Sequence, residues 1–317
     1  MAKRPAVTVL GSLNTDISLL VPHLPEPGET VLASAAATFG AGGKGANQAV
    51  AAARLGAAVS MAGCCGDDDF GARLRAGLAA EGVGVTGLRA VPGVASGLAL
   101  ITVDPAGENS IAVAAGANGL AGDAEVAAAF AQPCDVLVLS AEIPVPVLGA
   151  ALRRARADGV RTVLNLAPVP EGAAGLLAEC PDWLVVNAQE ASALAGRPAD
   201  ATPADEAALG RDMAAGLAAG LRGGHAVVTL GAAGAVLAGP SGTAAVPGFR
   251  VTAVDTVGAG DAFVGALAVA LASGLDPAAA VTAACAAGAA AATGRGAQAA
   301  LPRPADVLAA TGFSWPA

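Results

Sequence analysis

The sequence predicts an α/β protein whose mostly parallel sheet is covered by helices on both faces, a doubly wound arrangement. Three observations predict this class. Short runs of β-branched residues and Leu alternate along the chain with Ala-rich helical stretches, which is typical of parallel α/β folds. Most strand-like runs lack polar alternation, as expected when both faces of a strand are buried. Hydrophobic residues make up 55% of the 317 positions and charged residues 14%, so disorder is excluded and a large core is feasible.

The expected strands and helices follow one another in alternation. Strands are expected at residues 7–10, 136–139, 162–166, 183–186 and 226–230. Helices are expected at residues 48–55, 70–81, 147–158, 205–221 and 262–273. The two longest apolar stretches, 262–275 and 278–292, are rich in Ala and Gly and are separated by Asp276-Pro277. They indicate buried helices, because a membrane span needs about 20 strongly apolar residues without interruption.

Two segments depart from this alternation. Residues 17–39 contain three prolines, and residues 96–116 resemble a hairpin with a turn at Asp104-Pro105-Ala106-Gly107. Neither segment has an obvious place in a parallel sheet. A small accessory β-layer, such as a lid inserted in a single domain of residues 1–317, accounts for both.

Charge and cysteine content exclude several classes of protein. The net charge of −9 argues against binding to nucleic acid and against membrane attachment through a basic patch. The five cysteines are odd in number and lack C-x-x-C spacing, which indicates neither a disulfide framework nor a zinc site. Lys3 and Arg4 are not followed by the apolar segment of a signal peptide. We therefore expect a soluble cytoplasmic protein.

The most specific motif is Asp255-Thr256-Val257-Gly258-Ala259-Gly260-Asp261, at the start of an expected helix. Its glycines permit a tight turn, so that backbone amides point outward at the helix N-terminus. Such a terminus binds anions through unpaired N–H groups and the helix dipole. Asp261 at its mouth suits a general base beside a phosphoryl group. The alternative is that Asp261 caps the helix and the glycines form an ordinary turn.

Two segments nearer the N-terminus carry polar groups that suit a ligand. Residues 40–49 contain four glycines, match neither a Walker A nor a Rossmann pattern, and bring Lys44 and Asn47 to the start of an expected helix. Asn14 and Asp16 follow the first strand, on the side where parallel sheets bind ligands. An amide and a carboxylate together suit vicinal hydroxyls. The alternative for each segment is an ordinary turn that binds no ligand.

Three further positions follow expected strands. Glu190 suits an Mg²⁺ ion bound through water, although it equally suits a helix cap. Thr229 begins a glycine-containing turn that could contact a nucleotide phosphate, and Glu142 follows the strand at 136–139 toward the same cleft. His23 and His225 form no catalytic triad or metal-binding set.

These motifs, in this order, resemble the ribokinase-like carbohydrate kinases over nearly the whole chain, and the motif at 255–261 is highly specific for that superfamily. The resemblance implies a doubly wound α/β domain with a β-lid. It also implies ATP-dependent phosphorylation of the 5-hydroxyl of D-ribose. Within the family, residues 42–48, 107–109, 116–118 and 296–298 are most similar to the branch that acts on ribose.

The resemblance implies a role for each motif residue. Asp261 is the base, and the amides of Gly258, Ala259 and Gly260 form an anion hole. The implied sugar-binding residues are Asn14, Asp16, Gly42, Gly43, Lys44, Asn47, Glu142 and Asp261. The implied nucleotide-binding residues are Asn187, Thr229, Gly231, Gly234, Gly260 and Cys285, and Glu190 is associated with Mg²⁺. A monovalent cation, usually K⁺, is implied at Asp255, Val257, Ala291, Gly294 and Gly296.

Three positions depart from the family pattern. Ala300 stands where Ser often supplies a possible K⁺ ligand, Ala233 where a basic residue is common, and Cys285 where a nucleotide contact is often polar. Two alternative functions stay open. One is a kinase of the same superfamily acting on a deoxy sugar, a nucleoside or a sugar phosphate. The other is a non-catalytic sugar-binding regulator.

The expected lid also predicts self-association. Its hairpin segment holds Leu98, Leu100 and Ile101, and such apolar residues on a small sheet need cover. We expect a homodimer joined through the lid, which is also what the family resemblance implies.

Overall fold

The computed structural model describes residues 4–196 and 206–316. Within them the main sheet has nine strands in the order β13-β12-β11-β10-β9-β8-β1-β4-β5. The strands from β11 to β5 in this order pair in parallel, whereas β12 and β13 pair antiparallel at one edge. Their bounds are β1 (Ala6–Leu10), β4 (Ala58–Gly66), β5 (Gly84–Val91), β8 (Val136–Ser140), β9 (Arg161–Asn165), β10 (Trp183–Asn187), β11 (His225–Thr229), β12 (Gly234–Gly239) and β13 (Gly242–Pro247).

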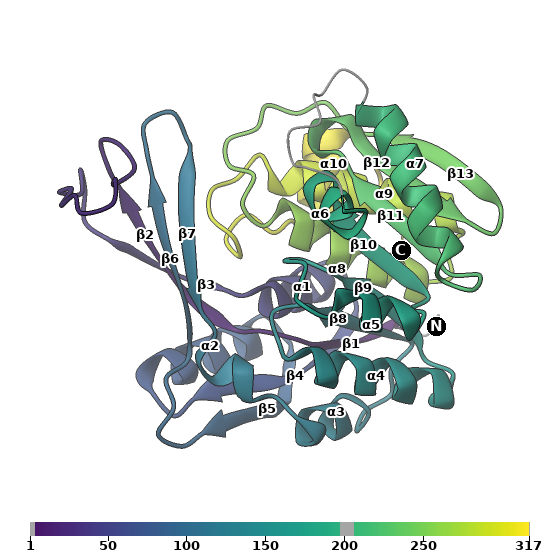
Figure 1. The fold of residues 1–317 in the computed structure, drawn as a ribbon, viewed down its shortest axis with the longest axis horizontal. Helices are drawn as coiled ribbons and strands as arrows, with labels where there is room; N and C mark the ends of the chain where they lie inside the picture. Colours follow the sequence, from purple (N-terminus) through teal and green to yellow (C-terminus); the bar gives the residue numbers. More distant parts are fainter. Residues whose placement is uncertain (1–3, 197–205, 317) are drawn as a thin grey trace.

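Helices cover both faces of this sheet (Figure 1). They are α1 (Lys44–Arg54), α2 (Asp69–Ala80), α3 (Asp123–Ala129), α4 (Val145–Asp158), α5 (Ala173–Ala178), α6 (Ala188–Leu194), α7 (Glu206–Ala219), α8 (Ala259–Ala272), α9 (Pro277–Ala291) and α10 (Pro304–Thr311). Alternate strand residues supply two separate cores. Val136 and Val138 belong to the core that includes α1, α8 and α9, whereas Leu137 and Leu139 belong to the core that includes α4. This double burial explains the absence of polar alternation and confirms the predicted fold class.

The five predicted strands of the main sheet are confirmed as β1, β8, β9, β10 and β11. Strands β4, β5, β12 and β13 were not predicted, because they are rich in Gly and Ala and so lack a strong β propensity. Helix α1 begins at Lys44, four residues earlier than expected. The helix expected at 205–221 is seen as α7 from Glu206, and Asp205 lies outside the described residues.

A second sheet stands beside the carboxyl ends of the main strands (Figure 1). Its four strands in the described chain have the order β3-β2-β6-β7. They are β2 (Asn14–Leu20), β3 (Thr38–Gly42), β6 (Gly97–Val103) and β7 (Asn109–Ala114). Segments 17–39 and 96–116 contribute to this sheet, but β2 begins at Asn14 and β3 ends at Gly42. The alternative that Asn14 and Asp16 lie in a turn is therefore wrong, because both lie on a strand.

No helix within residues 4–196 and 206–316 has both the length and the apolar character that a membrane span requires. The five cysteines all lie in these ranges and form no disulfide.

Candidate active site

Polar side chains gather where neighbouring strands of the main sheet end. Glu142 follows β8, Asn165 ends β9, Asn187 ends β10 and Thr229 ends β11. Because the carboxyl ends of parallel strands meet at one edge, this is the side on which α/β sheets bind ligands. A cavity of about 210 Å³ opens there. The sequence-predicted residues that line it are Lys44, Asn187, Glu190, Thr229, Gly258, Gly260 and Asp261.

The N-terminus of α8 forms an open anion site in this cavity. Gly258 is its N-cap with φ of 82°, and a Cβ at this position would lie 2.9 Å from the carbonyl oxygen of Ala297. Only glycine meets both demands. In the part of the chain that the structure describes, no side chain accepts a hydrogen bond from the amides of Gly258, Gly260 or Asp261. These amides and the helix dipole therefore face the cavity without an internal partner.

The N-terminus of α1 differs, because the protein's own groups already occupy it. Its N-cap is Gly43, with φ of 86°. Glu142 Oε2 accepts from the Lys44 amide at 3.0 Å, and the Ser12 hydroxyl accepts from the Gly45 amide at 3.3 Å. Ser12 in turn donates to Glu142. Of these two glycine-capped helices, only α8 can offer its amides to an anion. The sequence analysis missed Ser12.

Asp261 lies in the first turn of α8 and is only 7% exposed. Its carboxylate does not cap the helix. Instead, Oδ2 accepts from Asn47 Nδ2 at 2.8 Å, and Oδ1 accepts from Gln48 Nε2 at 3.0 Å. Burial raises the pKa of Asp261, while Lys44 and the two amides act in the opposite direction. The helix-cap alternative is wrong for this residue, and its surroundings are those of a functional carboxylate.

Lys44 supplies the positive charge of the cavity. The carboxylate of Asp261 raises the pKa of Lys44 most, burial opposes this effect, and Glu142 and Glu190 add to it. The ammonium group therefore stays charged at neutral pH among three acidic side chains. Such a group balances the carboxylates and can meet an anionic ligand.

Asn14 and Asp16 lie next to the glycine-rich segment because β2 pairs with β3. Asp16 lies directly against Gly42, where a Cβ would come within 2.2 Å of its Oδ2. Burial, and then the charges of Glu142 and Asp261, raise the pKa of Asp16 to about 6. Asn14 Oδ1 accepts from Asn118 Nδ2 at 2.8 Å, so its own amide nitrogen is the group left for a ligand. This arrangement offers a carboxylate acceptor and an amide donor to sugar hydroxyls.

Asn187 and Glu190 form a reciprocal cap at the start of α6. Asn187 Oδ1 accepts from the Glu190 amide at 2.8 Å, and Glu190 Oε2 accepts from the Asn187 amide at 2.7 Å. The capping alternative is therefore confirmed, yet Glu190 also lines the cavity. Its carboxylate suits Mg²⁺, which is usually held by one or two carboxylates together with substrate phosphates.

The remaining positions implied for nucleotide binding lie in different surroundings. Thr229 lines the cavity, and its hydroxyl donates to the carbonyl oxygen of Val186 at 3.5 Å. Gly231 is exposed in the turn after it. Gly234 has φ of 99°, and a Cβ there would lie 2.2 Å from the Val246 carbonyl oxygen, which is a structural reason for glycine. Cys285 is buried in α9, does not line the cavity, and has its pKa raised to about 12 by burial.

The positions implied for a monovalent cation lie on two loops that are tied together. Asp255 accepts from the amides of Val257 at 3.0 Å and Gly296 at 2.9 Å. Ala291 and Gly294 lie at the end of α9 and just beyond it, and Ala300 packs beside Gly294. Across residues 4–196 and 206–316, no cluster of three or more His, Cys, Asp or Glu could hold a metal. A cation between these loops would therefore depend on backbone carbonyls.

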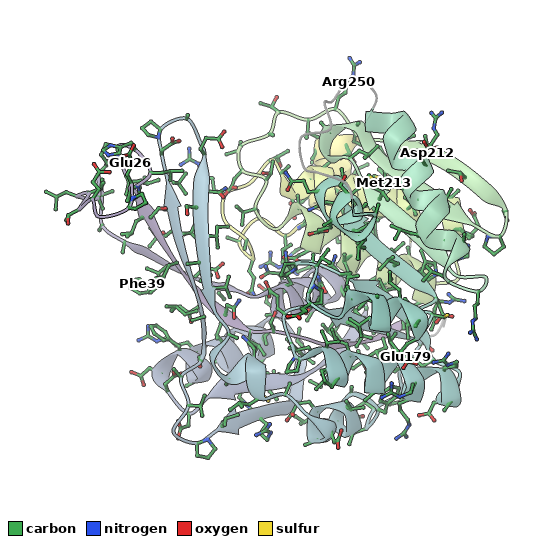
Figure 2. All side chains as sticks on the ribbon, viewed as in Figure 1. Glu26, Phe39, Glu179, Asp212, Met213 and Arg250 are labelled. Atoms are coloured by element: carbon green, nitrogen blue, oxygen red, sulfur yellow. The ribbon has the colours of Figure 1, made fainter. Side chains whose placement is uncertain are left out.

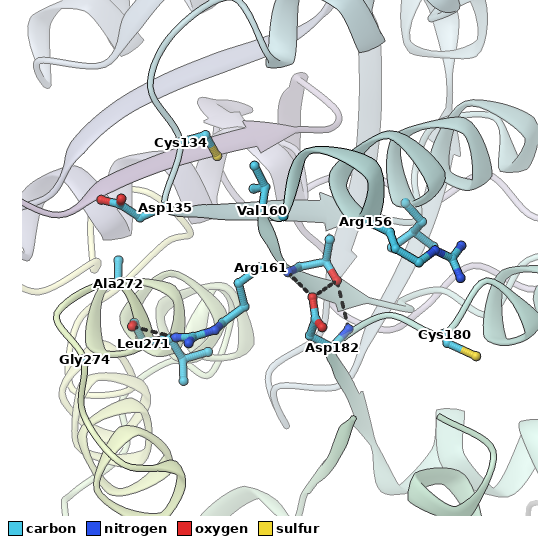
Figure 3. Close-up of a pocket in the computed structure, with 13 residues that line it drawn as sticks. Cys134, Asp135, Arg156, Val160, Arg161, Cys180, Asp182, Leu271, Ala272 and Gly274 are labelled. Atoms are coloured by element: carbon cyan, nitrogen blue, oxygen red, sulfur yellow. Dashed lines mark hydrogen bonds between the residues drawn. The ribbon is translucent and has the colours of Figure 1, made fainter. Parts of the chain in front are cut away.

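A larger cavity, of about 650 Å³, lies at the opposite ends of the strands, where β8, β9 and β10 begin (Figure 3). There Arg161 donates to the carbonyl oxygen of Leu271 at 2.9 Å, and Asp182 accepts from the amide and the hydroxyl of Thr162. These polar groups satisfy one another, as the dashed lines in Figure 3 show. The smaller cavity, with its open helix terminus and buried carboxylate, is the candidate active site.

Comparison with known proteins shows which family the chain belongs to. Residues 4–304 match the family described as "pfkB family carbohydrate kinase". A ribokinase of Schizosaccharomyces pombe is 37% identical over 276 residues, which cover 84% of this chain and 86% of that protein. A deoxyribokinase of Salmonella typhi is 35% identical over 299 residues, covering 93% and 95%. The structure of Arabidopsis thaliana ribokinase complexed with ribose and ATP superposes with a TM-score of 0.80 at 28% identity, covering 97% of this chain and 98% of that one.

Proposed function

Because the chain belongs to the pfkB family of carbohydrate kinases and is a sugar kinase, we propose that it transfers the γ-phosphoryl group of ATP to the 5-hydroxyl of D-ribose. The observation that carries this proposal is the buried Asp261 carboxylate at the open N-terminus of α8. A base and an anion site at one point are what phosphoryl transfer to an alcohol requires. The product would be D-ribose 5-phosphate.

The proposed mechanism assigns the steps to residues of the cavity. Asp261 accepts the proton of the 5-hydroxyl as the oxygen attacks the γ-phosphorus. The amides of Gly258 and Gly260 neutralise charge on the transferred phosphoryl group. The Ala259 amide, the third member of the implied anion hole, donates to the Thr256 carbonyl oxygen at 3.2 Å. Mg²⁺, held by the phosphates and through water by Glu190, would supply further charge neutralisation. Asn14, Asp16 and Lys44 orient the sugar, which makes positioning a large part of the rate enhancement.

Nucleotide binding is proposed at Asn187, Thr229 and the turn that contains Gly231. The ribokinase of Arabidopsis thaliana, solved with ribose and ATP, supports ATP as the donor. Ala233 offers no basic side chain in this turn. The amides of α8 and Lys44 would therefore carry more of the attraction for the phosphates, against a net protein charge of −9.

The deoxyribokinase of Salmonella typhi makes 2-deoxy-D-ribose the second candidate substrate. A sugar phosphate is disfavoured because Lys44 is the one basic residue in the lining of the described cavity and is balanced by Asp261. A nucleoside is disfavoured because aromatic residues make up 3% of the chain, so few can stack on a base.

A substrate panel tests this proposal. ATP-dependent turnover is measured with D-ribose, 2-deoxy-D-ribose, fructose, fructose 1-phosphate and adenosine. The highest kcat/KM is expected with D-ribose. A higher value with another acceptor would replace the substrate but retain the kinase. No turnover of any acceptor, together with measurable ribose binding, would contradict the kinase and favour a sugar-binding regulator.

We further propose a monovalent cation, with K⁺ the expected ion, between the loops around Asp255 and Gly296. Backbone carbonyls of Val257, Ala291 and Gly294 would complete its ligands. Repeating the ribose assay in K⁺ and in a tetramethylammonium salt of equal ionic strength tests it. Activation by K⁺ is expected although Ala300 supplies no hydroxyl. Equal rates in both salts would contradict the proposal.

We also propose a homodimer formed through the second sheet, in a cytoplasmic protein. The five free cysteines support a reducing compartment. Phe39 and Leu100 on the second sheet are 62% and 49% exposed, which supports a partner that covers them.

A further inference from the structure

A chain of three side chains leads from a backbone carbonyl to the proposed catalytic carboxylate. Asn165, at the end of β9, donates from Nδ2 to the carbonyl oxygen of Val185 at 3.2 Å. Its Oδ1 accepts from Gln48 Nε2 at 3.0 Å, and the same nitrogen donates to Asp261 Oδ1 at 3.0 Å. An amide nitrogen carries two hydrogens, so these two bonds use the full donor capacity of Gln48.

Each amide in this chain has a fixed orientation. The carbonyl oxygen of Val185 can only accept, so Asn165 must present its nitrogen there and its oxygen to Gln48. Gln48 must then present its nitrogen to Asn165 and to the carboxylate. Rotating either amide by half a turn would place oxygen against oxygen. The direction of every bond therefore follows from one backbone group that cannot turn.

This arrangement leaves another group unsatisfied. Gln48 is fully buried, and its Oε1 has no hydrogen-bond partner within the described chain. The same is true of Asn47 Oδ1, whose amide nitrogen donates to Asp261 Oδ2. Buried acceptors without partners are rare because they lose their hydration. Asn47 and Gln48 thus both direct their amide N–H groups to the Asp261 carboxylate, although this leaves their amide oxygens without hydrogen bonds.

We propose that Gln48, held by Asn165, is a positioning residue that fixes the orientation of the Asp261 carboxylate and favours its ionised form. This inference rests on the proposed function, in which Asp261 is the base. Gln48 touches no reacting atom in this scheme. It acts through Asp261, because a donor on Oδ1 stabilises the charge that burial opposes.

Other charged groups face Asp261 from every element packed around it. They are Lys44 on α1, Asp16 on β2, Glu142 after β8 and Glu190 on α6. Substitution of Gln48 leaves all four in place. A difference between the variant and the parent protein therefore reports on the hydrogen-bonded chain Asn165–Gln48–Asp261, which we call the relay.

The pH dependence of kcat tests the proposal. In Gln48→Met the donor is lost while volume and apolar packing are retained. The ionised form of Asp261 loses stabilisation, its pKa rises, and the acidic limb of the kcat profile moves to higher pH by about one pH unit. At any pH on the acidic limb we expect kcat to be about tenfold lower than in the parent, with the loss recovered on the plateau at higher pH. The KM for the sugar should change much less.

Two further variants keep the test independent of the folding of Gln48→Met. Gln48→Glu retains the shape and places a second carboxylate against Asp261, so its acidic limb should move at least as far. Asn165→Leu removes the acceptor that orients Gln48 and should move the limb in the same direction. Ser140→Ala is the matched control, because the Ser140 hydroxyl is buried without a partner and has no bond to Asp261. Its profile should match the parent.

The outcomes separate this inference from the proposed function. If Asp261→Asn keeps its kcat, the assignment of the base fails and the relay with it. If Asp261→Asn is inactive but folded Gln48 and Asn165 variants keep the parent's acidic limb, only the relay is overturned. A uniform loss of kcat at all pH values, with no shift of the limb, would also overturn it, since that is the result of a purely structural role.

Discussion

Asp261 is a carboxylate in a place where its charge is costly. Burial raises its pKa, and Glu142 adds repulsion. Lys44, Asn47 and Gln48 offset these effects through one positive charge and two hydrogen bonds. A chain selected for stability alone would place an apolar residue here. The conflict between burial and charge is what physical chemistry leads one to expect at a catalytic position.

Asp261→Asn should separate the role of this carboxylate in catalysis from its role in folding. Asn keeps the shape but cannot accept a proton, so kcat should fall by about 10²–10⁴-fold, the usual contribution of a general base. The KM for the sugar should change far less. Steady-state kinetics and circular dichroism check this, with the exposed Asp212→Asn on α7 as control. A folded Asp261→Asn protein with near-normal kcat would contradict the assignment.

The Asp16 carboxylate should lower the free energy of unfolding at neutral pH. Its folded pKa of about 6 lies above the unfolded value of 3.8. The folded state therefore binds more protons between these values, and stability is lost as pH rises through 6. Asp16→Asn escapes this loss and should be more stable at pH 7.5 by up to about 3 kcal/mol. Its sugar KM should rise, because a charged acceptor is lost.

Urea unfolding of the parent protein and Asp16→Asn at pH 4, 6 and 7.5 measures the effect. The stability difference should be largest at pH 7.5 and should nearly vanish at pH 4. Equal stability of the two proteins at pH 7.5 would show that the carboxylate carries no such penalty.

At the scale of elements, the site depends on how closely α1 approaches α8. Gly265 of α8 lies against α1, where a Cβ would come within 2.7 Å of Ala51 Cβ and 2.8 Å of the Gln48 carbonyl oxygen. This contact lets Asn47 and Gln48 on one helix reach Asp261 on the other. The small residues of α8 and α9 thus serve the site as well as the core.

Gly265→Ala should force the two helices apart. Overpacking of this kind costs about 1–3 kcal/mol, and the displaced Gln48 would loosen its hold on Asp261, so kcat should fall as well. Gly77→Ala on α2 is the matched control, since no atom lies within 4 Å of its Cβ position. That change should raise stability by about 0.5–1 kcal/mol. Thermal unfolding and kcat are measured for both variants. Equal changes of Tm and kcat in Gly265→Ala and Gly77→Ala would show that the close approach of α1 and α8 is not required.

The sequence predicts elements where local preferences are strong. The Val- and Leu-rich strands could be placed within one or two residues, but β12, with the sequence Gly-Ala-Val-Leu-Ala-Gly, is a strand chiefly because it pairs with β11. The start of α1 could not be predicted from the sequence, because Lys44-Gly45 resembles a loop. Glycine there is required by the close approach of Ser12, whose amide nitrogen would lie 2.6 Å from a Cβ.

The site could be predicted in its motifs but not in its connections. Asp261, Lys44 and Glu190 are conspicuous in the sequence, and they do line one cavity. Gln48 belongs to the glycine-rich motif at 40–49, but nothing in the sequence gave it a role beside Asp261, and Asn165 lies in no predicted motif. Gln48 is separated from Asp261 by 213 residues, and only the folded chain brings the two together. Contacts of this kind follow from topology rather than from local pattern.

At the scale of the whole molecule, the two faces of the second sheet carry different kinds of side chain. Asp16 pairs with Gly40 and Ala99, whereas its neighbour Ile17 pairs with Phe39 and Leu100. Because successive strand residues point to opposite faces, Phe39, Ile17 and Leu100 share the face away from Asp16. Figure 2 shows Phe39 on the outer side of this sheet. The proposed sugar-binding face is therefore backed by an apolar surface exposed in the single chain.

A second copy of the chain is the expected cover for this outer face. If so, Phe39→Asp should weaken the dimer by about 30-fold or more, because burying an unpaired charge at an interface costs at least about 2 kcal/mol. Light scattering across a dilution series measures this. Leu308→Asp on α10 is the matched control, since Leu308 is 49% exposed but lies far along the chain, outside the second sheet. A parent protein that is monomeric at micromolar concentration, or an equal effect of both substitutions, would show that the outer face is not the interface.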